Sequence, residues 1–267
     1  MKKLKKEEIG RLGLYEFQGY IGAMTSPTFG GWKGTNRLIA LLNIEEMEKP
    51  KILEVGCSTG YIARYVAQKF DCAIIGVDLS TLLLNIAEEE SRKINLNNVI
   101  FKYANVESLP FPDNTFDIVY GEAITALVTD PLKVLREYKR VLKPGGKVAT
   151  LDLFGKESLS DKLVEETNEI MSNVLGTTVE IRSLQEWKQI FEKSGFSRVK
   201  IDDYYDDLFI RHYTFGERIK LTCKLLYHMT VNKEIRQKII PPLKFAKKFQ
   251  KALRAGNYGY LIFTGVK

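Results

Sequence analysis

The segment Ile52–Gly60 constrains the fold of this chain more than any other feature. It reads Ile-Leu-Glu-Val-Gly-Cys-Ser-Thr-Gly, an apolar run followed by a turn with two glycines. A helical pattern comes next, and the following apolar run, Ala73–Asp78, ends in a carboxylate. Such a pairing suits a nucleoside-bearing cofactor, because the glycine turn brings the backbone close to the ligand and the carboxylate accepts hydrogen bonds from ribose hydroxyls. The segment therefore predicts an α/β sheet with a nucleoside site at its edge.

Apolar runs continue to alternate with helical patterns along the chain. We expect strands at 51–55, 73–78, 99–103, 116–121, 147–153, 197–205 and 258–266. We expect helices at 59–70, after the N-cap residue Ser80, at 131–142 and at 183–194. Repeated β-α units predict a mostly parallel sheet with helices on both faces.

The composition of the chain limits the compartment and the kinds of site that can be expected. Its 267 residues, 45% of them hydrophobic and 27% charged, suffice for a sizeable globular core. There is no run of about 18 consecutive apolar residues, and no apolar segment follows the basic start of the chain as it would in a secretory signal. Its three cysteines show neither metal-ligand spacing nor a disulfide framework. We expect a cytoplasmic protein without a metal site, with peripheral attachment to a membrane left open.

Positive charge is concentrated between Arg211 and Arg254. This segment holds 12 basic and two acidic residues, so its net charge is +10, whereas the whole chain carries +7. Apolar residues recur at helical spacing before Pro241-Pro242 and again after it, and the second stripe could pack on the protein itself, which is the favoured interpretation, or on a membrane. The segment is expected to form a lid over an acceptor, a surface for anionic lipid headgroups, or a surface for nucleic-acid phosphates. Nucleic acid is the least favoured partner, because no RNA-binding module or base-flipping signature is present.

Four segments, taken together, resemble a known family. Glu54–Gly60 resembles the first motif of class I S-adenosylmethionine-dependent methyltransferases, and Ile75–Ser80 is similar to the second. Ser108–Val119 and Arg136–Gly146 resemble the segments that lead into the fourth and fifth strands of that family. The similarity is to the branch of ubiquinone and menaquinone C-methyltransferases and of tocopherol, sterol and other small-molecule methyltransferases.

The resemblance implies one Rossmann-like domain over residues 1–267. Its seven-stranded, mostly parallel sheet would end in an antiparallel last strand, with an N-terminal helical arm and a helical insertion before that strand. Residues 1–48 would form the arm, 49–205 and 256–267 the core sheet, and 206–255 the basic insertion. The oligomeric state is not implied.

The resemblance also implies the site. S-adenosyl-L-methionine would be the cofactor and S-adenosyl-L-homocysteine its product. The implied cofactor-binding residues are Glu54, Gly56, Cys57, Ser58, Gly60, Asp78, Leu79, Asn105, Val106, Glu122 and Tyr20. The implied catalytic residue is Glu122. His212 and His228, the only histidines of the chain, are further catalytic candidates, because either could act as a base if the basic insertion folds over the pocket. The implied substrate-binding residues are Tyr15, Trp32 and Tyr205.

Several of these residues have a structural interpretation as well. Glu122 could cap the next turn, Cys57 could simply fit as a small apolar residue, and either histidine could be structural. Tyr15, Tyr20 and Trp32 could pack in the core. Two positions depart from the family pattern: Ser58 replaces the middle glycine, where a positive φ would be strained, and Asn105 replaces an aspartate and could merely form a turn.

Three functions are compatible with these features. The favoured one is methyl transfer by in-line displacement to a small or lipid-like acceptor, catalysed mainly by proximity and orientation. The alternatives are an RNA or protein methyltransferase that uses the basic insertion, and a non-catalytic protein that binds the cofactor. A dinucleotide-dependent dehydrogenase fits poorly, because its Gly-x-Gly-x-x-Gly turn would need glycine at Ser58 and Tyr61.

Overall fold

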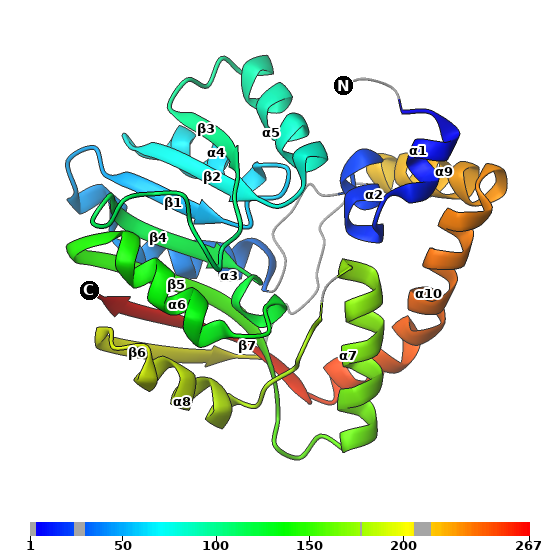
Figure 1. The fold of residues 1–267 in the computed structure, drawn as a ribbon. Helices are drawn as coiled ribbons and strands as arrows, with labels where there is room; N and C mark the ends of the chain where they lie inside the picture. The colour runs from blue at the N-terminus through cyan, green and yellow to red at the C-terminus, as the bar shows by residue number, and fades with distance from the viewer. Residues whose placement is uncertain (1–3, 24–29, 177, 206–214) are drawn as a thin grey trace.

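A single seven-stranded sheet organises the molecule (Figure 1). The computed structural model describes residues 4–23, 30–176, 178–205 and 215–267. The strand order is β3-β2-β1-β4-β5-β7-β6, and β7 runs antiparallel to β5 and β6 while the pairs from β3 through β5 are parallel. The strands are β1 (Lys51–Val55), β2 (Ala73–Asp78), β3 (Val99–Tyr103), β4 (Phe116–Glu122), β5 (Leu142–Gly155), β6 (Ser197–Tyr204) and β7 (Tyr258–Val266). The expected Rossmann-like sheet with an antiparallel last strand is confirmed.

Helices lie on both faces of this sheet (Figure 1). The N-terminal and central helices are α1 (Lys6–Arg11), α2 (Leu14–Tyr20), α3 (Gly31–Leu42), η1 (Ile44–Glu46), α4 (Tyr61–Lys69), α5 (Thr81–Lys93), η2 (Thr125–Leu127) and α6 (Pro131–Val141). The later helices are α7 (Asp161–Leu175), α8 (Leu184–Lys193), α9 (Phe215–Val231) and α10 (Lys233–Arg254). Within the described ranges, none of the helices is both long and apolar enough to cross a membrane.

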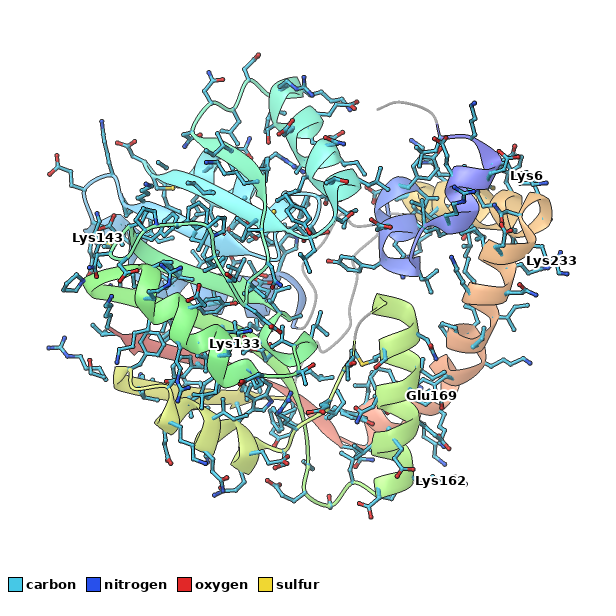
Figure 2. The ribbon with its side chains drawn as sticks, in the orientation of Figure 1. Lys6, Lys133, Lys143, Lys162, Glu169 and Lys233 are labelled. Carbon is cyan, nitrogen blue, oxygen red and sulfur yellow. The ribbon has the colours of Figure 1, made fainter. Side chains whose placement is uncertain are left out.

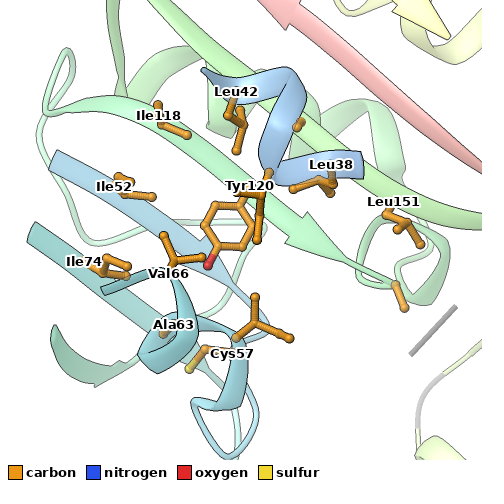
Figure 3. Packing of buried hydrophobic residues seen from close by; sticks show 14 of the residues in the cluster. Leu38, Leu42, Ile52, Cys57, Ala63, Val66, Ile74, Ile118, Tyr120 and Leu151 are labelled. Carbon is orange, nitrogen blue, oxygen red and sulfur yellow. The ribbon is translucent and has the colours of Figure 1, made fainter. Parts of the chain in front are cut away.

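Each face of the sheet buries its own apolar cluster. On one face, Ile52 and Tyr120 pack with Leu38 and Leu42 of α3 and Val66 of α4 (Figure 3). Side chains alternate between the faces of a strand, so neighbouring residues such as Leu53 and Val119 enter the opposite cluster. That second cluster contains Val134, Tyr138, Trp187, Phe191 and Phe263 from α6, α8 and β7. The sheet is therefore anchored on both sides and can hold functional side chains at its edge in fixed positions.

Two helices go beyond what the sequence pattern indicated. The helical pattern after Pro241-Pro242 is not a separate helix, because α10 begins at Lys233 and runs through both prolines. A proline inside a helix removes one backbone hydrogen bond and tends to bend the axis, but it need not end the helix. Helix α7 was not expected, and no side chain caps its first turn.

The N-terminal arm and the basic insertion meet and form one unit, here called the cap (α1, α2, α9 and α10). Its small core contains Ile9, Leu14, Phe17, Ile21, Ile235 and Ile239. Lysine side chains of the insertion also donate to backbone carbonyl groups of the arm: Lys224 Nζ to Ile21 at 2.7 Å and Lys238 Nζ to Leu12 at 2.7 Å. Segments at opposite ends of the chain are thus packed as one layer beside the sheet (Figure 1).

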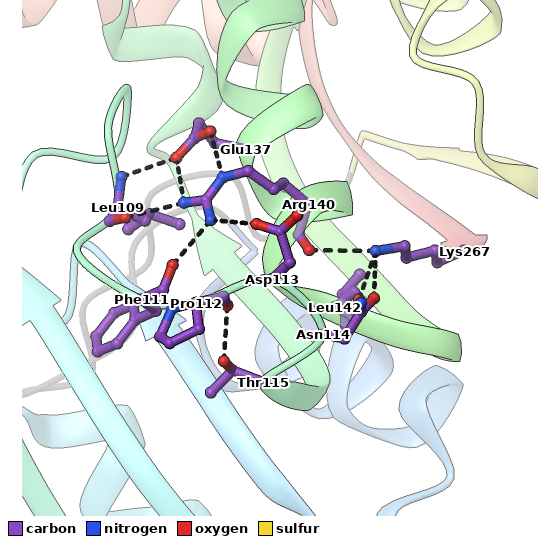
Figure 4. A network of polar contacts seen from close by, with 10 residues as sticks. All are labelled: Leu109, Phe111, Pro112, Asp113, Asn114, Thr115, Glu137, Arg140, Leu142 and Lys267. Atoms are coloured by element: carbon purple, nitrogen blue, oxygen red, sulfur yellow. Dashed lines mark hydrogen bonds and ion pairs between the residues drawn. The ribbon is translucent and has the colours of Figure 1, made fainter.

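Arg140 of α6 fixes the segment that leads into β4 (Figure 4). Its guanidinium group donates to the backbone oxygens of Leu109 at 2.9 Å and Phe111 at 2.8 Å. It also pairs with the carboxylates of Glu137 and Asp113, each at 2.8 Å. Hydrogen bonding to Arg140 lowers the pKa of Glu137. The sequence motifs 108–119 and 136–146 therefore belong together because one side chain joins them.

We expect replacement of Arg140 by methionine to lower the free energy of unfolding by roughly 2–3 kcal/mol, because several charge-assisted hydrogen bonds are lost together. Chemical denaturation measures the change. The matched control is Arg136→Met on the same helix, where the side chain is exposed; it should alter stability by less than about 0.5 kcal/mol. Equal losses in the two variants would contradict the structural role of the Arg140 network.

Candidate functional site

Asp78, at the end of β2, connects the turn after β1 and the start of α5 at the edge of the sheet formed by the carboxyl ends of its parallel strands. One carboxylate oxygen accepts from the N–H of Ser58 at 2.9 Å, and the other accepts from the N–H of Ser80 at 2.9 Å. Burial raises the pKa of Asp78, and these backbone hydrogen bonds oppose the rise. Each carboxylate oxygen has two lone pairs, so both can still accept from a ligand. The turn after β1 and the start of α5 are thus held on the carboxylate that the sequence singled out.

The turn after β1 has the strained conformation expected for a tight approach to a ligand. Gly56 and Gly60 have φ of 67° and 66°, and Ser58 has φ of 51°. A non-glycine residue in this region costs about 1 kcal/mol, and here the Asp78 hydrogen bond helps to hold it. The side of Gly56 where a Cβ would lie is filled by Ile124, so the glycine also permits packing against the loop after β4. Cys57 is buried beside Gly76, in agreement with its interpretation as a small apolar residue.

Two buried acids and a tyrosine lie together at the ends of β1 and β4. Glu54 is directly opposite Tyr120 in the β1–β4 pairing, and Glu122 follows two residues later on the same face. Burial raises the pKa of Glu54 well above its usual value, and the negative charge of Glu122 adds to this rise. One oxygen of each carboxylate and the Tyr120 hydroxyl have no hydrogen-bond partner among the described residues. Buried acceptors without partners are rare in proteins, so the two carboxylate oxygens are candidates for contact with a ligand.

Glu122 is held from the other side by α3. The hydroxyl group of Thr35, fully buried on that helix, donates to Glu122 Oε2 at 3.0 Å. Burial raises the pKa of Glu122 to about 7, although the Thr35 hydrogen bond works in the opposite direction. A carboxyl group with this pKa can take up or release a proton near neutral pH. Thr35 was not among the residues expected from the sequence, because its role depends on how α3 lies across the sheet.

The cap reaches this edge through α2. Glu16 Oε1 accepts from the hydroxyl group of Ser80 at 2.6 Å, next to Asp78. Tyr20, at the end of α2, packs against His228 of α9 with ring centroids 6.0 Å apart. Phe17 packs against the same histidine at 5.4 Å, and burial lowers the pKa of His228. His228 thus contributes to the contact between arm and insertion.

The remaining expected residues are spread around this edge. Trp32 packs on Tyr65 of α4 with centroids 4.7 Å apart, as its core-packing interpretation requires. The Asn105 side-chain oxygen accepts from the N–H of Glu107 at 2.9 Å, so this residue forms a turn. Of the others, Leu79 and Tyr205 are exposed, Val106 and Tyr15 are half-buried, and His212 lies outside the described residues.

Asp152 is a buried acid that the sequence analysis did not identify. It lies on β5, on the face opposite to Glu122, and its Oδ1 accepts from the N–H of Ala126 in η2 at 3.0 Å. Its other oxygen has no partner among the described residues, and burial raises its pKa to about 6. A charged residue inside the apolar run 148–154 is the signal that could have revealed it. Asp152 fixes the loop that follows Glu122.

We expect Asp152→Asn to change how stability depends on pH. Because the pKa of Asp152 is raised in the native state, its carboxyl group keeps its proton to a higher pH there than in the unfolded chain. Its contribution to the free energy of unfolding is therefore present below about pH 4 and is lost as pH rises through about 6. Asparagine can still accept from Ala126 without carrying charge. Between pH 4 and 7, the stability of the variant should therefore improve relative to the wild type by up to about 3 kcal/mol.

Chemical denaturation across this pH range provides the measurement. Asp203→Asn, at an exposed carboxylate of β6, is the control and should leave the wild-type profile unchanged. A parallel pH profile for Asp152→Asn and the wild type would contradict the assignment of this raised pKa.

Comparison with known proteins identifies a family model and several relatives that resemble this chain. A family model described as "Methyltransferase domain" matches residues 53–150. An uncharacterized protein from Haemophilus influenzae is 35% identical over 73% of this chain and 75% of its own length. Phosphoethanolamine N-methyltransferase 1 from Arabidopsis thaliana is 29% identical over 66% of this chain, and the match covers only 34% of that relative. The chain therefore spans about a third of that curated plant enzyme.

Among solved structures, phosphoethanolamine N-methyltransferase 2 from Haemonchus contortus, in complex with S-adenosyl-L-methionine, has the same fold. Its TM-score is 0.68 at 21% identity, and the match covers 98% of this chain and 57% of that chain. The coverage of this chain includes the arm and the insertion, so the likeness extends beyond the sheet.

Proposed function

The chain belongs to the class I S-adenosyl-L-methionine-dependent methyltransferases, and we propose that it methylates a small or lipid-like organic molecule. The observation that carries this proposal is Glu122. Its carboxyl group is buried, is oriented by Thr35 at 3.0 Å, and has a pKa raised to about 7. Such a group can accept the proton that an amine or hydroxyl acceptor must lose.

The residues at the sheet edge fit the cofactor. Asp78 has lone pairs available for both ribose hydroxyls, and the exposed Leu79 beside it offers an apolar surface for the adenine ring. The unpartnered oxygens of Glu54 and Glu122 suit a ligand that carries an ammonium group at its amino-acid end and a positively charged sulfonium. When bound, S-adenosyl-L-methionine supplies an activated methyl group. Asn105 and Val106 stay predictions as adenine contacts, and Tyr20 as a residue that closes over the cofactor.

The protein's contribution is mainly orientation and the removal of water. Thr35 fixes Oε2 of Glu122, which leaves Oε1 without a partner among the described residues and able to accept a hydrogen bond from the cofactor or a proton from the acceptor. The pairing of Asp152 with Ala126 holds the loop immediately after Glu122. An acceptor aligned in this way reacts faster even without a strong base, because the translational and rotational entropy needed to bring it to the methyl group has already been lost on binding.

The acceptor we favour is small or lipid-like. The relatives named as methyltransferases of phosphoethanolamine support a small acceptor, and the apolar and aromatic side chains of the cap support one with an apolar part. Tyr15, Trp32 and Tyr205 stay candidates for acceptor contacts, and His228 and His212 stay candidates for proton transfer. A macromolecular acceptor such as RNA or protein is the alternative, since the insertion is strongly basic.

The test is transfer of a labelled methyl group from S-adenosyl-L-methionine. Purified protein is incubated with phosphorylated amino alcohols, with a lipid extract, and with RNA and protein in separate reactions. We expect label in one of the first two. Label only in RNA or protein would establish the alternative acceptor, and label that never leaves the cofactor, despite tight binding, would establish the non-catalytic role.

A further inference from the structure

Exposed apolar side chains are concentrated on the two helices of the insertion. Of the 13 large apolar side chains exposed in the described part of the chain, seven lie on α9 and α10, which form the rim of the molecule (Figure 1). They are Phe215, Ile219, Leu226, Tyr227, Val231, Ile240 and Leu243. The other six are scattered over the core sheet and its helices. Single exposed apolar residues are normal, but a group on one surface indicates a partner.

Helix α9 is apolar on both of its sides. Its inner side packs Leu225 and Met229 against the arm. On its outer side Phe215, Ile219 and Leu226 follow one another at intervals of four and seven residues and are 80%, 49% and 56% exposed. Helix α9 also carries Glu217, Arg218, Lys220 and Lys224, and an amphipathic helix of this kind normally has its apolar residues covered and its charged residues in water. The arm covers only one side, so the outer side needs a second apolar environment.

The surface around this apolar group is strongly basic. Helices α9 and α10 together contain 11 lysine and arginine residues and only two acids, Glu217 and Glu234. Lys233, Lys244 and Lys251 are all exposed on α10. Lys233 follows Asn232, whose side chain donates to the backbone oxygen of Lys6 in α1 at 3.0 Å, and Figure 2 labels both lysines at the outer side of the cap. A second copy of the chain would bring two such surfaces together, and like charges would oppose that contact.

We propose that the outer face of α9 and α10 binds the surface of an anionic lipid bilayer. Apolar side chains would enter the boundary between headgroups and acyl chains, while lysine side chains reach anionic headgroups, as in amphipathic helices that lie on membranes. Binding to a bilayer does not require the proposed function. The proposal rests on that function in one respect: a lipid-like acceptor would reach the site from this surface.

The geometry connects this face with the candidate site. His228 is on the inner side of α9, where it touches Phe17 and Tyr20 of α2. The same α2 binds Ser80 beside Asp78 through Glu16. One helix therefore has the proposed bilayer surface on one side and the arm that borders the cofactor edge on the other.

Vesicle sedimentation tests the apolar part of the proposal. The full chain is mixed with vesicles of phosphatidylcholine alone or of phosphatidylcholine with phosphatidylglycerol, and we expect it to pellet with the second. The double variant Ile219→Glu with Leu226→Glu should bind the anionic vesicles at least about tenfold more weakly. The control is Ile94→Glu with Ile100→Glu, which changes side chains of similar exposure, 46% and 48%, outside the cap. This control should bind like the wild type.

A second pair of variants tests the charge. Lys244→Gln with Lys251→Gln should weaken binding about fivefold for each lysine removed, and added salt should weaken binding of the wild type. The matched control is Lys188→Gln with Lys193→Gln on α8, also exposed. Equal binding to both vesicle types, or no binding at low salt, would overturn the proposal.

Two further measurements separate the remaining outcomes. A dimer in sedimentation velocity that Ile219→Glu with Leu226→Glu abolishes would assign this face to a second copy and overturn the bilayer proposal. Affinity for S-adenosyl-L-homocysteine should be unchanged in every variant, because none of these residues is near Asp78. Failure of methyl transfer would leave the vesicle results intact, so the two proposals fail separately.

Discussion

Replacing Asp78 with alanine should weaken binding of S-adenosyl-L-methionine and S-adenosyl-L-homocysteine by about 2–4 kcal/mol, which is roughly 30- to 900-fold in Kd. Two hydrogen bonds from the ribose to a charged acceptor would be lost. The N–H groups of Ser58 and Ser80, 2.9 Å from the carboxylate, would also lose their partner, so the turn after β1 would be less well ordered. Isothermal titration calorimetry with S-adenosyl-L-homocysteine gives the measurement.

The control for this prediction is Asp78→Asn. Asparagine has nearly the same shape and keeps one oxygen that can accept from the backbone, so its effect should be intermediate. Circular dichroism must show that both variants remain folded. Unchanged affinity in a folded Asp78→Ala protein would exclude the assigned cofactor position.

Replacing Glu122 with glutamine should lower kcat about 10²- to 10⁴-fold at pH 8, if the acceptor must lose a proton. The wild-type rate should rise with pH through about 7, because only the deprotonated carboxylate can accept a proton and burial raises its pKa to about that value. The glutamine variant should lose this pH dependence. Initial rates with an acceptor from the labelled-methyl assay, measured from pH 5.5 to 9, would provide both comparisons.

Thr35→Val is the companion variant for Glu122. Valine has nearly the shape of threonine but cannot donate the 3.0 Å hydrogen bond, which lowers the pKa of Glu122. Its pH profile should therefore shift to higher pH, while affinity for S-adenosyl-L-homocysteine stays within a few fold. Equal kcat in Glu122→Gln and the wild type at every pH would show that Glu122 accepts no proton.

The strands and the cofactor edge were predictable because they depend on local sequence. Ala73–Asp78 and Val99–Tyr103 were expected with the bounds that the structure has, since both runs are apolar, short and bounded by turn residues. The position of Asp78 followed from the same run. In a parallel sheet the carboxyl ends of the strands meet at one edge, so a residue at a strand end has a known place before the structure is seen.

The remaining features of the site and of the cap depend on contacts between distant parts of the chain. The hydrogen bond of Thr35 to Glu122 spans 87 residues, and that of Lys224 to the carbonyl of Ile21 spans 203. No local pattern carries such information. The resemblance to a family gave the seven strands and the antiparallel last strand, but not the packing of the arm on the insertion. It also gave no sign that Asp152 is buried with one oxygen unpartnered, which depends on the loop around Ala126.

The place of β7 has a consequence for the order in which the chain folds during synthesis. β6 pairs only with β7 in the described sheet, and β7 follows the whole insertion in sequence. The ribosome therefore releases β6 about 50 residues before its partner strand exists. The side of α2 that faces the insertion also stays uncovered until α9 and α10 have been synthesised. Because non-local contacts form late and slowly, we expect β1 to β5 to fold first and β6 and the arm to be vulnerable to proteases until β7 is inserted.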